Sequence, residues 1–390
     1  MAQSKLSQLH DWLDERTGYR AALRRAADAP LPGGPRFSYV WGSALALALL
    51  LEAITGVLLM AAYAPSATTA WSSVAHITHG LRGGWLIRGL HNVGAQAIVI
   101  LLVVHLTRVA LAGAYRKPRE LNWLLGLGLA GLVGGFLFTG PLLVYDQYGY
   151  WANKVETNII GTVPLVGGWL RAMLLGGGEY GHLTLTRSYS LHAAVLPALT
   201  VLFLLAHASL ARRHGPTLPD AAAGAARADR YFPRQAARDV AVGLVLILVI
   251  FGVTAQLHGA PLDAPADPVS DYAARPAWYF RPLFELRKLL PAKLETLGVV
   301  GLPALFAAYV AALPFLDKRP ERKLAARLPV LAPLLLVLLG GAGLIAKSYA
   351  SDRADAEYQR ARKLADERAA RAIALFKEGV PPEGALAPSR

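Results

Sequence analysis

The sequence contains no cysteine among its 390 residues. Iron–sulfur clusters and thioether-linked haem need cysteine side chains, and disulfides need pairs of them, so this chain can carry none of the three. Charged residues are also scarce, at 17%, whereas 54% of the residues are hydrophobic and the mean hydropathy is +0.37. This balance is typical of a polytopic membrane protein.

Seven apolar stretches are each about long enough to cross a bilayer as a helix. We therefore predict an all-α membrane protein with seven spans. The first 37 residues are polar and carry six Lys or Arg, so we expect an amphipathic surface helix over 4–25 and no signal peptide. The predicted spans are Ser38–Ala62, Gly89–Ala112, Asn122–Val144, Ser190–Leu210, Asp239–Gln256, Leu297–Phe315 and Leu328–Ile345.

The net charge of +14 is distributed unevenly between the segments that connect the spans. If the N-terminus lies inside, segments 1–37, 108–119, 209–238 and 317–327 are inner and hold 21 Lys or Arg. The outer segments 63–88, 145–187 and 257–295 hold 10. This positive-inside bias places the C-terminus outside after seven spans. The basic excess thus reports membrane topology, and we expect no nucleic-acid partner.

Two of the apolar stretches carry two histidines each. His91 and His105 are 14 residues apart and His192 and His207 are 15 apart. These steps correspond to ~21 Å and ~22 Å of helix and return each pair to nearly the same face. One intramembrane histidine is usually a hydrogen-bonded core residue, but four at matched spacing are suited to ligating iron. Both spans run from outside to inside, so we predict two bis-histidine haems, His91 with His192 and His105 with His207.

Glycines in two other spans repeat the same interval. Each span carries a pair that is 14 residues apart, which equals the step from His91 to His105. Such glycines can simply allow close helix packing. Because the spacing matches, we favour a role in letting each porphyrin approach the backbone of a four-helix dihaem bundle. The four glycines are Gly42, Gly56, Gly126 and Gly140.

Charged residues near these sites are further candidates. Arg88, Arg108 and Arg187 flank the histidines near the membrane boundaries, where they are suited to pair with haem propionates. Glu52 lies inside the first span, where a carboxylate needs a partner, a proton or a function. The simpler alternative is a neutral Glu52 bonded to a backbone carbonyl.

The charge pattern also divides the chain. Residues 1–37 form the N-terminal surface segment, and 38–220 the dihaem four-helix part. Residues 221–348 form a part with three further spans and no intramembrane histidine, and 349–390 a charged tail. The tail has too few apolar residues for a core of its own.

Several motifs resemble the cytochrome b subunit of quinol-oxidising bc and b6f complexes. The form is closest to cytochrome b6 with subunit IV fused behind it, and the 15-residue histidine step resembles the b6 and Gram-positive forms. The resemblance runs from Asp11 to about Leu316 and is carried by Asp11–Arg16, Gly84–Arg88, Lys117–Leu121, Asp146–Ala152, Thr184–His192 and Arg275–Phe280.

The resemblance implies a subunit of a quinol:cytochrome c or similar oxidoreductase complex in a bacterial plasma membrane. It implies an outer low-potential haem b on His91 and His192, and an inner high-potential haem b on His105 and His207. Quinol would be oxidised near the outer face and quinone reduced near the inner face. The implied partners are quinone, a Rieske iron–sulfur protein, a c-type cytochrome subunit and a second copy of the complex. Val40 occupies the position where b6 forms carry a cysteine for an extra haem, so no covalent haem c is expected.

The resemblance also implies an outer quinol site at which the sequence departs from the family. The family motif is Pro-Glu-Trp-Tyr, but the chain has Ala277 between Pro276 and Trp278, followed by Tyr279. We predict that these residues line the site together with Tyr150, in the segment Tyr148–Lys154. Where the family usually has Gln, the chain has Glu52, which we hypothesise supplies an alternative protonatable group.

Two other functions remain open from the sequence. The missing carboxylate at Ala277 keeps open a dihaem membrane anchor that passes electrons between quinone and a partner dehydrogenase or reductase without bifurcation. A haem-free transporter is a third class, but it would have to explain four histidines at haem spacing.

Overall fold

The computed structural model describes residues 4–217, 229–318, 321 and 323–381. Seven of its helical segments are long and apolar enough to cross a membrane, which confirms the predicted all-α fold with seven spans. The spans are Trp41–Met60 (α3), Gly84–Leu111 (α5), Glu120–Val144 (α6), His182–His214, Arg234–Gln256 (α11), Ala292–Leu316 and Leu324–Ala354 (α14).

Two spans are built from several helical pieces. The fourth consists of α9 (His182–Ser190), the π-helical turn η3 (Leu191–Val195) and α10 (Leu196–His214). The sixth consists of the short turns η5 (Ala292–Leu294) and η6 (Leu297–Gly301), followed by α13 (Leu302–Leu316). Apolar side chains dominate α10 and α13, as expected where lipid cannot hydrogen-bond the backbone.

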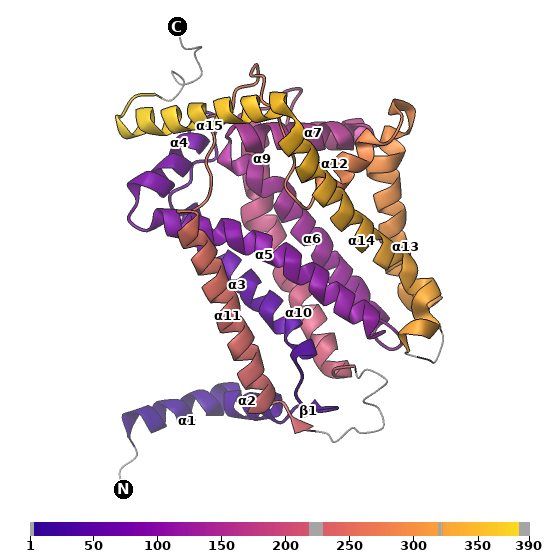
Figure 1. Cartoon of the computed structure of the whole chain (residues 1–390). Coiled ribbons are helices and arrows are strands. Elements are labelled where there is room, and N and C mark those ends of the chain that lie inside the picture. The colour runs from indigo at the N-terminus through magenta and orange to yellow at the C-terminus, as the bar shows by residue number, and fades with distance from the viewer. Residues whose placement is uncertain (1–3, 218–228, 319–320, 322, 382–390) are drawn as a thin grey trace.

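The first four spans form a bundle in which α3 packs on α5 and α6 packs on α10. Small residues make the first contact close, because Ala44 and Ala48 of α3 are buried against Ile98 and Leu101 of α5. The helix α11 leans on the same pair (Figure 1). This arrangement places α5 and the fourth span, the two spans with histidine pairs, in the same four-span bundle.

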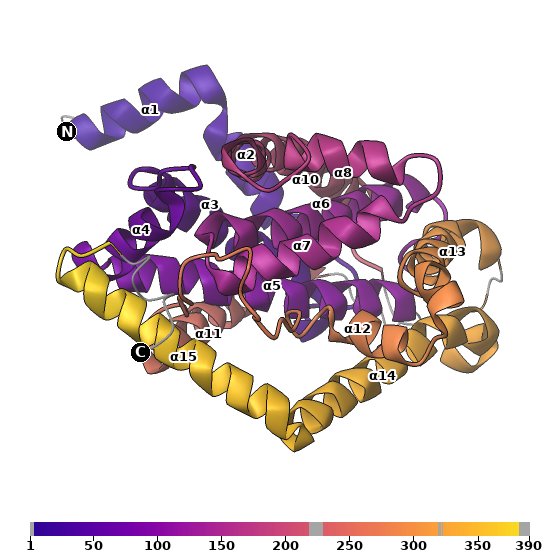
Figure 2. The same cartoon turned by 90° about the horizontal axis from the view of Figure 1, so that it is seen from above.

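The bundle has two differently covered ends, which we call upper and lower after Figure 1. Short helices and α15 (Ala356–Lys377) lie across the upper end (Figures 1 and 2). The short helices are α4 (Ala70–Ala75), α7 (Gln147–Gly161), α8 (Gly167–Leu175) and α12 (Arg281–Lys288), together with the π-helical turn η2 (His76–Gly80). Segment 145–187 thus contains the surface helices α7 and α8.

The charged tail forms α15, which docks on the upper end. Ala372 is fully buried, and the Phe376 ring meets Trp71 edge-on at a centroid distance of 6.1 Å. The tail thus adds its few apolar side chains to a cluster formed by α4 and the segment after α11. In the part of the tail that the structure describes, the buried apolar side chains belong to this shared cluster.

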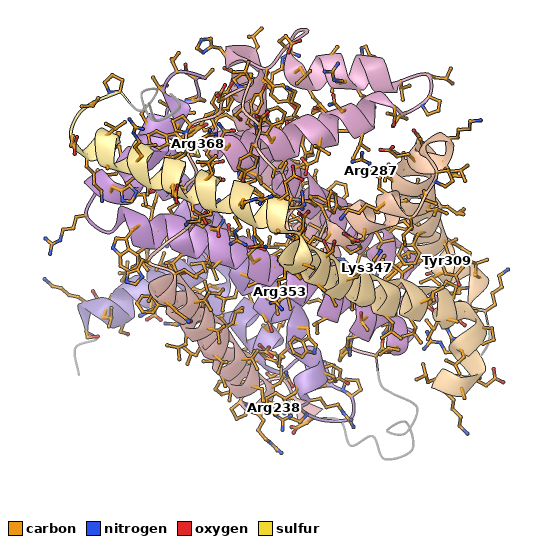
Figure 3. All side chains as sticks on the ribbon, turned by 45° about the horizontal axis from the view of Figure 1, so that its top comes forward. Arg238, Arg287, Tyr309, Lys347, Arg353 and Arg368 are labelled. Atoms are coloured by element: carbon orange, nitrogen blue, oxygen red, sulfur yellow. The ribbon has the colours of Figure 1, made fainter. Side chains whose placement is uncertain are left out.

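The lower end carries the N-terminal segment. The single helix predicted over 4–25 is divided into α1 (Lys5–Thr17) and α2 (Tyr19–Ala27), because Gly18 adopts a left-handed φ of 62° that ends α1. Strand β1 (Pro30–Leu31) then pairs antiparallel with β2 (Asp229–Arg230). Arg238, at the lower end of α11 (Figure 3), lies over the Phe37 ring at 5.2 Å and joins the short 3₁₀ turn η1 (Phe37–Tyr39) to α11.

A buried charge cluster joins the first spans to the last two near the lower end. The carboxylate of Asp317 accepts hydrogen bonds from Arg116 at 2.6 Å, from Tyr115 at 2.6 Å and from Arg327 at 3.0 Å. Burial raises the pKa of Asp317, but these hydrogen bonds outweigh it and hold the pKa below the ordinary value. Arg327 is fully buried and also donates to two backbone carbonyls at the end of α5.

The predicted division of the chain has no sharp structural boundary. The boundary at residue 220 falls outside the described residues. Helix α14 continues through residue 348 as far as Ala354, so the predicted tail begins inside that helix. The division therefore stays a prediction.

Candidate functional site

The four histidines form two facing pairs inside the bundle. His91 on α5 faces His192 on η3, with ring centroids 6.4 Å apart and ring planes at 68°. Lower in the bundle, His105 on α5 faces His207 on α10 at 6.5 Å and 71°. We call these the upper and lower histidine pairs. They are the pairs that the span directions indicate.

The separation within each pair fits an iron held between two imidazoles. Each metal–nitrogen bond is about 2 Å and each ring nitrogen lies about 1 Å from its ring centre, so the centroids of a bis-histidine site lie about 6 Å apart. The observed 6.4 Å and 6.5 Å agree with this value.

The unequal histidine steps are reconciled by the π-helical turn. A π-helical turn contains one more residue than an α-helical turn, and η3 (Leu191–Val195) lies at the start of the step from His192 to His207. Fifteen residues with this insertion therefore cover nearly the same rise and rotation as the 14 residues from His91 to His105. Without the turn, the two pairs would not both be in register.

The hydrogen bonds of two histidines leave Nε2 available as a ligand. His207 Nδ1 lies 3.0 Å from the Asn122 carbonyl oxygen, which can only accept, so Nδ1 carries the proton. Thr139 donates its hydroxyl proton to the Gly135 carbonyl and therefore accepts from His192 Nδ1, at 2.9 Å. A second ring nitrogen that donates to the protein is the usual arrangement for a metal-ligating histidine.

His91 has the same kind of partner and an additional one. Thr55 donates to the Leu51 carbonyl and lies 3.0 Å from His91 Nδ1. A Glu52 carboxylate oxygen lies 2.9 Å from the same nitrogen. The other Glu52 oxygen is buried and has no hydrogen-bond partner among the residues that the structure describes. It faces Gly94, where a Cβ would lie 2.1 Å from it. Glu52 thus contacts a histidine rather than a backbone carbonyl, which was the simpler alternative.

The upper pair is consequently asymmetric. Thr55-Gly56 on α3 and Thr139-Gly140 on α6 repeat the same dipeptide beside the two upper histidines. Three residues before the threonine, however, α3 has Glu52 whereas α6 has Phe136. The Phe136 ring meets His192 edge-on at 5.2 Å. Only one ring of the upper pair therefore contacts a carboxylate.

Each predicted glycine lies against one histidine ring. A Cβ on Gly140 would lie 3.0 Å from His192 Cε1, and one on Gly126 would lie 3.1 Å from His207 Cε1. On α3 the corresponding distances are 3.4 Å from Gly56 to His91 and 3.6 Å from Gly42 to His105. Larger side chains would displace the rings or fill the space beside them. The four glycines therefore form a cradle that fits two bis-histidine haems.

The three predicted arginines have different surroundings. Arg88 is buried and donates to Thr78 and to the carbonyls of Ala260 and Pro261, so it ties α5 to the segment after α11. Arg187 is exposed and donates to the Met173 carbonyl. Arg108 lies over the Tyr39 ring at 5.2 Å. These contacts give each arginine a structural role, and pairing with haem propionates stays a prediction.

The segment from Pro276 to Phe280 lies at the upper end near the upper histidine pair. Trp278 donates to Gln96 on α5 at 2.6 Å, five residues after His91. Arg275 and Arg281 flank the segment, and both donate to the Asp352 carboxylate of α14, at 2.8 Å and 2.7 Å. One buried aspartate thus holds both ends of the segment that carries the predicted quinol-site residues.

Tyr279 and Tyr148 lie close enough to interact electrostatically. Burial raises the pKa of Tyr279 to about 12, and the nearby Glu156 carboxyl adds to the shift. Burial also raises the pKa of Tyr148, with contributions from Tyr279 and Glu156. Tyr150, in contrast, is 2% exposed and packs on Tyr180 at 5.1 Å. The side chain of Tyr150 is thus packed inside the protein, whereas the side chains of Tyr148 and Tyr279 are only half-buried.

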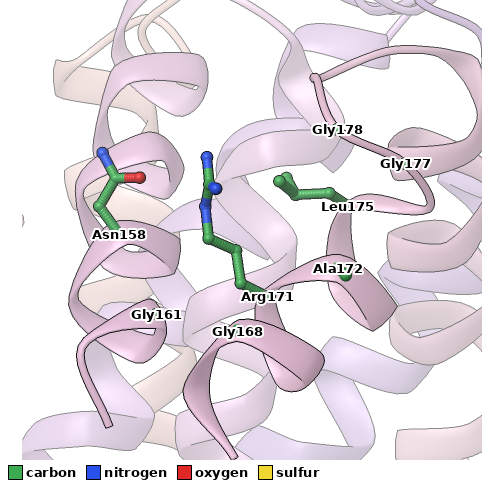
Figure 4. Close-up of a pocket in the computed structure, with 8 residues that line it drawn as sticks. All are labelled: Asn158, Gly161, Gly168, Arg171, Ala172, Leu175, Gly177 and Gly178. Atoms are coloured by element: carbon green, nitrogen blue, oxygen red, sulfur yellow. The ribbon is translucent and has the colours of Figure 1, made fainter.

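A separate pocket of ≈ 380 Å³ lies between α7 and α8 (Figure 4). The side chains of Asn158 and Arg171 extend into it, and glycines form much of its wall. Its lining includes none of the four histidines and none of the predicted quinol-site residues.

Comparison with known proteins agrees with this geometry. Residues 27–215 match the family model described as cytochrome b/b6/petB, and residues 265–357 match cytochrome b(C-terminal)/b6/petD. Cytochrome b6 of Gracilaria tenuistipitata var. liui is 37% identical over 214 residues, which are 55% of this chain and 100% of that protein. The chain belongs to the cytochrome b/b6 family. Its two matched regions follow one another as in a fused b6 and subunit IV.

A solved structure shares the fold of this cytochrome b. A hyperthermophilic respiratory Complex III superposes with a TM-score of 0.74 at 24% identity, covering 86% of this chain and 90% of the other. Membership of the family makes the chain a multi-pass membrane protein of quinol-linked electron transfer, a subunit of an oxidoreductase complex that binds b-type haem.

Sequence reasoning missed several residues of the site. Thr55 and Thr139 could have been found, because the Thr-Gly dipeptide recurs at two of the four cradle glycines. Gln96 and Asp352 had no such signal, since their partners lie 182 and 77 or 71 residues away in the chain. Glu156 was likewise one charged residue among many in the segment 145–187.

Proposed function

We propose that this cytochrome b carries electrons from quinol across the membrane through two bis-histidine b haems. The observation that carries the proposal is the pair of matched imidazole separations, 6.4 Å and 6.5 Å, at two levels of one bundle. We assign residues 38–220 to the dihaem part and 221–348 to the subunit-IV-like part. No covalent haem c is part of the proposal.

In this proposal each residue type has a distinct task. The four histidines would ligate iron through Nε2, and Thr55, Thr139 and the Asn122 carbonyl would fix their rings. The haems, when bound, supply one-electron redox centres. The four cradle glycines keep side chains out of the haem space, and the surrounding apolar spans keep out water. The ~21 Å between the two levels of α5 makes the transfer electrogenic, at ~2.3 kcal/mol per charge for 100 mV.

We further propose that the upper end faces outward and the lower end inward, in a bacterial plasma membrane. The distribution of Lys and Arg, 21 against 10, supports this orientation. The helices α1 and α2 lie at the opposite end from α15 (Figure 1), which agrees with an odd number of spans. Quinol would then be oxidised beside the upper histidine pair and quinone reduced near the lower pair.

The upper quinol site in this proposal lies around Pro276, Trp278 and Tyr279. The Trp278–Gln96 hydrogen bond supports it, because it connects this segment to the helix that carries His91. Tyr150 would support the site from its buried position on α7. A Rieske iron–sulfur protein and a c-type cytochrome subunit would take the second electron, in a complex that contains two copies of this chain.

A second candidate function rests on Ala277. Without a carboxylate in the Pro-Ala-Trp-Tyr motif, the chain could serve as a dihaem anchor that passes electrons between quinone and a partner enzyme without bifurcation. The two functions make different predictions about the response to an oxidant.

Oxidant-induced reduction distinguishes them. Membranes that contain the complex are equilibrated with quinol, an oxidant is added, and the α-band of the b haems is followed. If electrons bifurcate, the haems become transiently more reduced. A one-way anchor shows only oxidation, and the absence of any b-haem α-band would contradict both functions and favour a haem-free transporter.

A further inference from the structure

Helix α7 carries a half-open stripe beside the Pro276–Phe280 segment. Tyr148, Ala152 and Glu156 follow one another at four-residue steps, so they lie on one side of the helix. All three are partly exposed, whereas Asn153 and Thr157 on the adjoining face are buried. The side chains of this stripe are therefore neither fully packed nor fully exposed to water.

The buried face of α7 fixes how this stripe is aimed. Asn153 donates to the Phe138 carbonyl of α6 at 3.2 Å and accepts from the Tyr180 hydroxyl at 3.0 Å. Thr157 lies 2.6 Å from the same hydroxyl. These bonds hold α7 against α6 and against the segment before α9. Because Glu156 lies between Asn153 and Thr157 in sequence, these bonds also fix the side of α7 that carries Glu156.

Glu156 belongs to a cluster with three tyrosines, to which it contributes a carboxyl group. It acts electrostatically on Tyr148 of its own helix, on Tyr279 after α11 and on Tyr180 before α9. Burial raises the pKa of Glu156 to about 8, and a hydrogen bond with Asn153 lowers it only in part. The groups that set this pKa include no cation.

We propose that Glu156 accepts a proton from quinol at the upper end of the bundle. The inference rests on the proposed function, because it gives that reaction the carboxylate that Ala277 does not supply. A general base works best when its pKa lies near the operating pH, and among these groups Glu156 meets that condition. Its partners Tyr148, Tyr180 and Tyr279 are too weakly acidic to change charge between pH 6 and 9.

Quinol becomes quinone and loses two electrons and two protons. One electron would be taken by the haem that His91 and His192 would hold, and the other by a one-electron acceptor on a partner subunit. One hydroxyl proton is transferred to the Glu156 carboxylate, which becomes a carboxylic acid and then releases the proton to the outer aqueous phase. The second proton reaches the same phase by another route.

The other titratable groups facing the cluster do not share this pH range. Burial raises the pKa of Asp146, which precedes α7, to about 6. Its carboxylate is already engaged by the amides of Gly149 and Asp263, at 2.8 Å and 3.1 Å. Two cations also face the cluster: Arg171 of α8 lowers the pKa of Tyr180, and Arg281 of α12 lowers the pKa of Tyr148. A pH profile with an apparent pKa near 8 would therefore report Glu156.

The test uses membranes that contain the assembled complex, with decylubiquinol and, in parallel, menadiol as donors. The rate of quinol-driven b-haem reduction is measured from about pH 6 to about pH 9.5, a range centred on the pKa of about 8. Wild type is expected to speed up through that pKa as the carboxylate form accumulates. Glu156→Gln should lose this rise and be about 100-fold slower at the alkaline end. Glu156→Asp should retain a rise but with a displaced midpoint, because the shorter side chain changes the surroundings of the carboxyl group, and a profile identical to wild type would overturn the role of Glu156. Glu179→Gln, an exposed neighbour with the same charge change, should resemble wild type.

The outcomes separate the two levels of the proposal. If wild type reduces its haems with dithionite but with neither quinol, the proposed function itself fails. If wild type responds to quinol and Glu156→Gln keeps the same rate and pH profile, only the role of Glu156 is overturned. The dithionite-reduced α-band of every variant verifies that the complex has assembled, and Glu156→Asp provides the test if the glutamine variant does not assemble.

Discussion

Valine in place of single cradle glycines should remove one haem at a time. Gly140 lies against His192 of the upper pair and Gly126 against His207 of the lower pair, and both are on α6. Gly140→Val should therefore weaken the upper haem and leave the lower one, and Gly126→Val should do the reverse. The two variants on one helix should therefore affect different haems.

The magnitude follows from the distances. The new Cβ would lie 3.0 Å from His192 Cε1 in one variant and 3.1 Å from His207 Cε1 in the other, and the valine methyl groups would extend further still. Overpacking of this kind costs about 1–3 kcal/mol. Because each 1.4 kcal/mol is a factor of ten, haem affinity at the affected site should fall about 5- to 150-fold.

The same helix provides a matched control. A Cβ on Gly131 would meet nothing within 4 Å, so Gly131→Val changes helix propensity equally without contacting a histidine. The purified variants would be assayed for haem b per chain by pyridine haemochrome and for each site by potentiometric titration. The reasoning is refuted if Gly140→Val keeps both haems with unchanged potentials, or if Gly131→Val loses haem to the same extent.

Two further predictions concern other parts of the structure. Asp317→Ala would leave the fully buried Arg327 without its carboxylate and should cost about 3–5 kcal/mol of unfolding free energy, measured by thermal unfolding in detergent. Glu295→Gln breaks the half-exposed ion pair with Arg287 and should cost less than about 1 kcal/mol of unfolding free energy. Equal losses in the two variants would contradict a stabilising role of the buried Asp317–Arg327 pair. Glu52→Gln removes a carboxylate from His91 and should raise the midpoint potential of the upper haem by about 60 mV, a tenfold change in a one-electron equilibrium. An unchanged potential in a titration would exclude that influence.

The parts of this fold that depend on local sequence were predictable. Hydropathy located the seven spans, since a span must be apolar wherever it faces lipid. Helical periodicity placed the histidines at two levels. The 14-residue glycine intervals then indicated which helices lie opposite them, and Gly126 and Gly140 do face histidine rings.

The parts that depend on tertiary contacts were not predictable. The π-helical turn beside His192 has no residue signature, although its effect is visible in the 15-residue step. Nothing in the sequence indicated that Arg88 bonds to carbonyls of the segment after α11, because those carbonyls lie 172 and 173 residues away. The break at Gly18 was also missed. The composition of residues 4–25 predicts one continuous helix, but the left-handed backbone of Gly18 divides it in two.

Glu52 and Glu156 show how the structure divides two roles that the sequence could not separate. Glu52 lies beside the upper histidine pair, and Glu156 lies on α7 at the upper end of the bundle. Glu52 contacts His91 directly and is therefore suited to tuning the ligand rather than to relaying a proton from quinol. Glu156 lies on α7 among tyrosines that border the Pro276–Phe280 segment, so the proton-accepting role hypothesised for Glu52 is better suited to Glu156.

The most direct test of the account is the haem content and ligation of the purified complex. We expect two haems b per copy of this chain, both low-spin with bis-imidazole electron paramagnetic resonance signals and resolved midpoint potentials. His192→Leu should remove one signal and His207→Leu the other. A single haem, a high-spin signal from the wild-type protein, or loss of neither signal in these variants would contradict the account.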